Sequence, residues 1–243
     1  MDHNEAVLSE SILTGHSDVE KGAYLSAIAS IATADKQASP EEMEYMRQLC
    51  EAADLSESQK RNVLNAANET SGEELKKSLD ILKNSELKFS LVTDLMAFAK
   101  ADQNYSEEES QYVQKISHYL GVDQKQFSLL NQFASDTTNS SAPPEKIAEP
   151  GFLSGLKEKM QSAGINPNSL FKGLIAIAGP IILSKMLSRR GAGQSGGMFG
   201  NLGGMLSGAG LTGGLGSLIG MLSGGNGMRN TGGLFDRVLR GAF

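Results

Sequence analysis

The chain of 243 residues is long enough for one sizeable hydrophobic core or two smaller units. Its single cysteine, Cys50, excludes an intramolecular disulfide framework and indicates a reducing compartment. Residues 1–136 carry 24 acidic and 12 basic side chains, a net charge of 12 − 24 = −12, whereas residues 137–243 carry 4 and 10, a net charge of 10 − 4 = +6. The acidic part therefore argues against nucleic acid as a partner and favours cations or basic surfaces.

The first 17 residues are polar and acidic and lack the pattern of a secretory signal, so we expect a flexible N-terminus (1–17) on a cytoplasmic protein. From Asp18, the expected cap of the first helix, apolar residues recur with the helical period. The first helix should bury one face, which carries Tyr24, Leu25, Ile28, Ile31 and Ala32. Seven helices are predicted in all, with starts near Asp18, Ser39, Ser56, Ser71, Glu86, Ser106 and Asp123. Because no stretch alternates with a period of two, the pattern predicts an all-α bundle of about seven helices over residues 18–134.

One stretch of this predicted bundle occurs twice. In each copy an apolar helix ends in Ala-x-Ala-Asp, at Asp35 and at Asp102, and a short polar loop leads to the Ser that opens the next helix. The offset between the copies is constant, because Asp102 follows Asp35 at the same distance along the chain as Glu109 follows Glu42. A repeated helix–acidic loop–helix unit predicts an internal pseudo-repeat.

The acidic residues of the two loops are the best candidate for a site. Hard cations such as Ca²⁺, Mg²⁺ or Mn²⁺ need several oxygen ligands close together. The candidate ligands are Asp35, Glu41, Glu42, Asp102, Glu108 and Glu109. The second loop is not an EF-hand, because Glu107 and Val113 stand where that loop needs Gly and Glu.

Helix capping is the alternative explanation of the same residues. Glu42 and Glu109 each stand three residues after the Ser that opens the helix, where a capping-box Glu belongs. Acidic residues in a first helical turn also interact favourably with the helix dipole. Capping does not require the duplicated Asp, so both interpretations stay open.

The two loops also carry a resemblance to the tellurite-resistance TerB-like family, over residues of about 20–133. That family has two Ala-Asp-Gly…Glu-rich loops, each between an apolar helix and a helix that opens near Ser-Pro-Glu-Glu. The matching runs here are Ala34-Asp35 with Ser39-Pro40-Glu41-Glu42, Ala101-Asp102 with Ser106-Glu107-Glu108-Glu109, and the ending Leu120-Gly121-Val122-Asp123. The family's Gly after each Asp is replaced by Lys36 and by Gln103. The resemblance implies an all-helical fold with internal pseudo-symmetry. It also implies an acidic face, suspected of binding metal, that joins Asp35, Glu42, Asp102 and Glu109.

The rest of the chain differs in character. Residues 135–150 are expected to be a polar, Pro-containing linker, and residues 151–243 a Gly-rich, apolar and basic tail that is partly helical. A short amphipathic helix is predicted from Gly151 to Met160. Asn166-Pro167-Asn168-Ser169 then caps an apolar run that Gly179-Pro180 interrupts and that is too short for an unbroken membrane span.

Two interpretations of this tail stay open. Its glycine content, 24 of the chain's 28, is typical of a flexible low-complexity segment. Small-xxx-small spacings such as Gly216…Gly220, and the basic pair Arg189-Arg190, favour membrane association or self-association instead.

The chain has no nucleophile motif, P-loop or dinucleotide fingerprint, so we expect a non-enzymatic protein, with Cys50 as inert core. The favoured hypothesis is a stress-response or scaffolding module. Its acidic face would bind a divalent cation or a basic partner, and its tail would attach it to a membrane or an assembly. The alternative is a structural protein that self-assembles through the Gly-rich tail. A protein partner or self-association is expected, with peripheral membrane contact through the tail and no nucleic acid.

Overall fold

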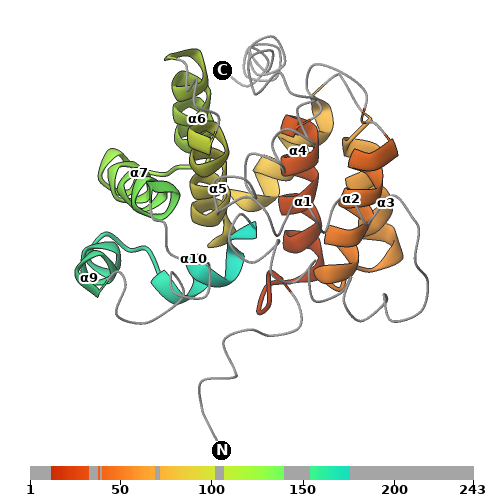
Figure 1. Ribbon diagram of the computed structural model, residues 1–243. Helices are drawn as coiled ribbons and strands as arrows, with labels where there is room; N and C mark the ends of the chain where they lie inside the picture. The colour runs from red at the N-terminus through yellow and green to blue at the C-terminus, as the bar shows by residue number, and fades with distance from the viewer. Residues whose placement is uncertain are drawn as a thin grey trace, which may run out of the picture.

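The computed structural model of the protein describes residues 12–32, 38, 40–68, 72–101, 107–139 and 154–175, and these residues form helices and no strand (Figure 1). All seven predicted helices are present, which confirms the all-α fold. They are α1 (Asp18–Ala32), α2 (Pro40–Ala52), α3 (Glu57–Ala66), α4 (Glu73–Leu82), α5 (Leu87–Ala101), α6 (Glu107–Tyr119) and α7 (Gln124–Asn139). Two more helices follow, α9 (Ser154–Ser162) and α10 (Pro167–Gly173).

Helices α1–α3 and α5–α7 form an internal pseudo-repeat. The offset that separates Asp35 from Asp102 also separates the first residues of α2 and α6, the last residues of α2 and α6, and the first residues of α3 and α7. The spacing of the acidic loops therefore recurs in the helix bounds. In Figure 1 the helices α1–α4 form one half of the molecule and α5–α7 the other.

Helices α1 and α5 are the central helix of each half. Residues 22–31 of α1 and 89–97 of α5 are all buried, so these stretches of the two helices are covered on every side. The predicted apolar face of the first helix is buried at Tyr24, Leu25, Ile28 and Ile31, and the opposite face of this stretch is buried as well. The reason is that α1 packs against α2, α3, α4 and α5 together, and its small residues leave no solvent-facing stripe.

The helix starts are fixed by a mixture of caps. The backbone N–H of Ser17 donates to the Glu20 carboxylate (2.9 Å) and the N–H of Glu20 donates to Ser17 Oγ (3.3 Å), so Ser17, not Asp18, caps α1. The Asp18 carboxylate instead accepts from the N–H (3.0 Å) and the hydroxyl (2.6 Å) of Ser56, which itself caps α3 as predicted. At α4 the N-cap is Gly72 with φ 83°, which has no side chain to cap that start, and the Ser71 of the predicted start lies outside the described residues.

The folded part extends beyond residues 18–134 in both directions. Ile12 and Leu13, inside the segment expected to be flexible, are buried, and the N–H of Ile12 donates to the carbonyl of Ala52 (3.0 Å). Helix α7 continues to Asn139, inside the segment expected to be a linker. Apolar contacts account for the first of these extensions, because Ile12 and Leu13 belong to the common core.

The predicted helices at the start of the tail pack against the seven-helix bundle α1–α7, which we call the head. Helix α9 lies on α7, and α10 lies on α5 (Figure 1). Asn166 caps α10 as predicted, with its side chain accepting from the N–H of Asn168 (3.1 Å) and of Ser169 (3.4 Å). The buried apolar residues of this segment are Leu156, Met160, Ile165, Leu170, Leu174 and Ile175. We call residues 166–175 the strap.

Candidate functional site

The predicted acidic site falls largely outside the described residues. Asp35 and Asp102 lie outside them altogether. Glu41 and Glu42 belong to the first turn of α2, and Glu108 and Glu109 to the first turn of α6, but their side-chain positions are not described. Whether these six carboxylates meet therefore stays a prediction. Among the residues that the structure does describe, no group of three or more His, Cys, Asp or Glu is placed to hold a metal ion.

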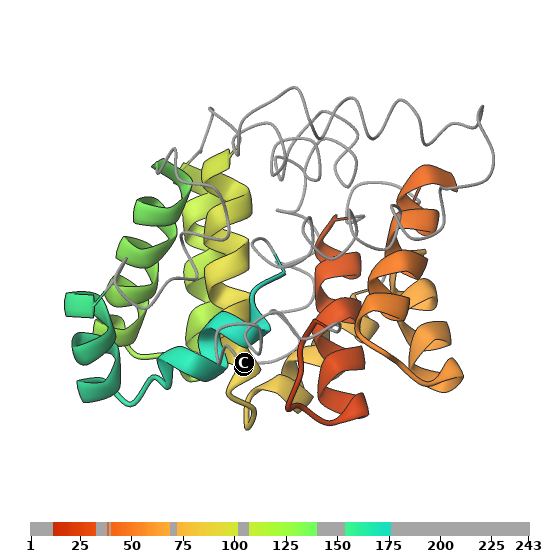
Figure 2. The same ribbon diagram turned by 60° about the horizontal axis from the view of Figure 1, so that its bottom comes forward.

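The helices that precede the two acidic loops, α1 and α5, nevertheless run in the same direction. Near the start of α1, Glu20 lies beside Ser85, which comes just before α5. Further along both helices, Tyr24 of α1 contacts Asp94 of α5. Helices α1 and α5 are therefore parallel, and their carboxyl ends lie at the same end of the molecule (Figure 2). The amino ends of α2 and α6 lie at that end as well, so both acidic loops join helix ends on one side of the protein.

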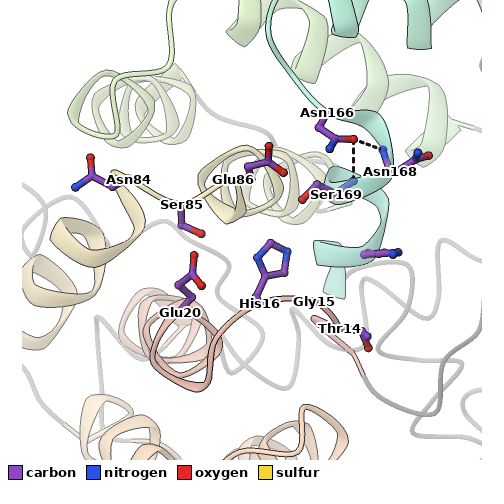
Figure 3. Close-up of a pocket in the computed structure, with 11 residues that line it drawn as sticks. Thr14, Gly15, His16, Glu20, Asn84, Ser85, Glu86, Asn166, Asn168 and Ser169 are labelled. Carbon is purple, nitrogen blue, oxygen red and sulfur yellow. Dashed lines mark hydrogen bonds between the residues drawn. The ribbon is translucent and has the colours of Figure 1, made fainter.

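A polar pocket of about 410 Å³ lies at the opposite end of α1 and α5. Three segments that are far apart in the sequence form it (Figure 3). They are the start of α1 with the residues before it, the turn between α4 and α5, and the start of the strap. Its lining residues are Thr14, Gly15, His16, Glu20, Asn84, Ser85, Glu86, Asn166, Asn168, Ser169 and Lys172.

Three polar side chains of the pocket, Glu20, Ser85 and Asn166, form hydrogen bonds at helix starts. Hydrogen bonds from the hydroxyls of Ser17 and Ser85 lower the pKa of Glu20 to about 2, so this carboxylate is ionised at neutral pH. The Ser85 hydroxyl also accepts from the N–H of Leu87 (3.2 Å) at the start of α5. His16 lies between the α1 and α5 sides, and its partial burial lowers its pKa (Figure 3). The pocket is thus a polar junction where three helices begin.

A fully buried carboxylate, Asp94, lies where the two halves meet. Its Oδ2 accepts from the hydroxyl of Tyr24 (2.6 Å) and from the backbone N–H of Ile175 (2.9 Å), so it joins α1, α5 and the strap. Burial and the Asp94 charge also raise the pKa of Tyr45, whose hydroxyl is buried without a hydrogen-bond partner among the described residues. We call the interface between α1 and α5, with Asp94 at its centre, the seam.

Sequence reasoning missed Asp94. The signal was present, because Asp94 is the only charged residue in the buried run 89–97 of α5. A lone carboxylate inside an apolar helix is rarely buried unless it is paired or hydrogen-bonded. The partners could not have been named from the sequence, since Tyr24 and Ile175 lie 70 and 81 residues away.

With this geometry in view, the comparison with protein families is decisive for the head. Residues 21–132 match the family model described as Tellurite resistance protein TerB. The helical head is a TerB-like domain. Comparisons with curated proteins and with solved structures gave no match.

The TerB-like match begins inside α1 and ends inside α7, so it includes both repeats and both acidic loops. It leaves out α9 and the strap. The strap supplies one wall of the pocket and one of the partners of Asp94. In this chain the TerB-like domain therefore carries an addition that packs on it. Within the described part of the chain, no helix is long and apolar enough to cross a membrane.

Proposed function

We propose that the protein is a non-enzymatic TerB-like module whose acidic loops form a face for a divalent cation, Ca²⁺, Mg²⁺ or Mn²⁺, or for a basic partner. The tail would attach this module to a membrane or an assembly, as in a stress-response scaffold. The observation that carries the cation part is the parallel course of α1 and α5. It brings the helix ends on either side of Asp35 and Asp102 to one end of the domain (Figure 2).

Helix electrostatics supports a cation at this end. The carboxyl end of an α-helix carries a partial negative charge, and two such ends, of α1 and α5, lie on the same side. Seven carboxylates, the six candidate ligands and Glu107, belong to the loops or to the helix turns next to them, against the basic side chains of Lys36 and Lys100. A divalent cation would lower the repulsion among these carboxylates, which is a favourable interaction that capping alone does not provide.

Thermal unfolding of the full-length chain tests the cation face. We expect the melting temperature to rise in millimolar Ca²⁺, Mg²⁺ or Mn²⁺ relative to EDTA, because ligand at about 100 times its Kd adds roughly 2.7 kcal/mol to the free energy of unfolding. The variant Asp35→Asn/Asp102→Asn should lose this rise. A matched control is Asp54→Asn/Glu86→Gln, which removes two exposed carboxylates at the far ends of α2 and α5. If no metal raises the melting temperature, or if the control variant loses the rise equally, the acidic residues are helix caps.

The tail part of the proposal is carried by its charge pattern. From residue 191 to residue 228 the tail has no charged residue, and Arg189-Arg190 stand directly before this stretch. Basic residues near an anionic bilayer contribute about 1 kcal/mol each. We expect the full-length protein to float with vesicles that contain anionic lipid, and the variant Arg189→Glu/Arg190→Glu to float less. Equal flotation of both proteins, or none by either, would contradict peripheral attachment through this pair.

A further inference from the structure

The main chain of the strap, as well as its side chains, contacts the seam. At its end, the N–H of Ile175 donates to Asp94 Oδ2 (2.9 Å), and at its middle the carbonyl of Leu170 accepts from Ser90 Oγ (3.1 Å). Both partners are fully buried residues of α5. Two main-chain contacts to buried side chains fix the register of the strap on α5, as in the recognition of a bound peptide.

The fit between the strap and α5 is close at one glycine. A Cβ built on Gly173 would lie 2.2 Å from Ser90 Oγ and 2.9 Å from Leu87 Cδ2, so no larger residue fits there without a shift. The neighbouring apolar side chains have exposed fractions of 2 % or less; they are Leu170, Leu174 and Ile175. The seam therefore selects a segment with a glycine between apolar residues.

The strap lies outside the two repeats of the domain that it covers. The TerB-like match ends at residue 132, and both repeats are complete before the strap begins. Residues 140–153, which join α7 to α9, number fourteen, and a chain of this length spans at most about 48 Å when extended. In an exchanged pair, the α9 of one molecule would have to lie within this reach of the end of that molecule's own α7.

We propose that the seam is a docking groove for this segment, occupied in each molecule by its own strap, and that it accepts the strap of a second copy when its own is released. Exchange of an identical segment between copies keeps every contact and changes only the chain that supplies it. This proposal goes beyond the proposed function, because it uses neither the acidic loops nor the part of the tail after residue 175.

A binding assay in trans tests the groove. The probe is a fluorescein-labelled synthetic peptide of residues 154–175 with an amidated carboxyl end, titrated with full-length protein and followed by anisotropy. In the wild-type chain the tethered strap competes at an effective concentration near millimolar. The Gly173→Ala chain should bind the peptide at least about tenfold more tightly, because the clash with Ser90 frees its groove.

Two further chains sharpen the assay. Ile175→Pro removes the N–H that Asp94 accepts, and it should expose the groove to the peptide in the same way as Gly173→Ala. Gly155→Ala is the matched control, because a Cβ on this exposed glycine of α9 meets nothing within 4 Å, and it should behave as wild type. A peptide that itself carries Gly173→Ala should not bind any chain.

Three outcomes would overturn the proposal. Equal peptide affinity for all four chains would place binding elsewhere on the protein. Absence of binding to Gly173→Ala and Ile175→Pro chains that melt cooperatively would show that the seam does not accept the segment in trans. Loss of the cooperative melt in both variants would show that the strap is an inseparable part of the core.

Discussion

The buried pair Tyr24–Asp94 should contribute measurably to stability, and the fold supplies its own control. Changing Tyr24 to Phe removes the hydroxyl that donates to Asp94 Oδ2 at 2.6 Å and leaves a buried carboxylate with one donor fewer. A hydrogen bond to a charged group is worth about 1.5–3 kcal/mol, which is the expected loss in the free energy of unfolding. For a protein of this size that corresponds to roughly 3–12 °C in melting temperature.

Tyr45→Phe is the matched deletion. The hydroxyl of Tyr45 is also buried but has no partner among the described residues, so its removal takes away a desolvated group and no bond. We expect this variant to be as stable as wild type or slightly more stable. Urea unfolding followed by circular dichroism, with equal m-values in all three proteins, gives the two differences. Equal losses in the two variants, or no loss in Tyr24→Phe, would refute the reasoning.

Three other predictions concern acid, the cysteine and the strap. Because hydrogen bonds lower the pKa of Glu20 from 4.5 to about 2, its carboxylate stabilises the fold above pH 4.5, and this contribution is lost as the pH falls from 4.5 towards 2. In the Glu20→Gln variant the free energy of unfolding should therefore fall less between pH 4.5 and pH 2. The difference should be at most about 1 kcal/mol, because the side chain is largely solvated. The same fall in both proteins would contradict this. Burial raises the pKa of Cys50 to about 12, so a thiol reagent at pH 8 should label it only in denaturant, and rapid labelling of the folded protein would argue against its burial. A chain that ends after residue 139 should bind the dye ANS and melt lower than one that ends after residue 178, because only the longer chain keeps α9 and the strap; equal melting temperatures would contradict the packing.

The sequence was a good guide wherever the information is local. Apolar periodicity and Ser-x-x-Glu/Gln patterns placed all seven helices of the head, and Gly121 adopts the positive φ (72°) predicted for a helix end. The cap of α1 was misplaced by one residue, because Ser17 and Asp18 are both good caps and the choice depends on Ser56 of α3. That contact lies 38 residues away and has no local signature.

The long-range features could not be predicted in the same way. The duplicated loops indicated a repeat, but not that the repeats meet along two parallel, fully buried helices with a carboxylate between them. Nor did the composition of residues 154–175 distinguish a packed segment from the polar and glycine-rich stretches on either side. What decides its packing is complementarity with α5, at Ser90 and Asp94, and complementarity is a property of two segments together.

The acidic loops and the strap can therefore be tested independently, because they lie towards opposite ends of the same helices. Helices α1 and α5 have 15 residues each and are about 22 Å long, with the loops at their carboxyl ends and the pocket beside their amino ends. Effects of substitutions separated by more than about 10 Å usually add. A cation-dependent rise in melting temperature should hence persist in the Gly173→Ala chain, and peptide binding by that chain should persist in EDTA. If EDTA abolished peptide binding, the two ends would be coupled through α1 and α5, and the seam would be the element that transmits the cation signal to the tail.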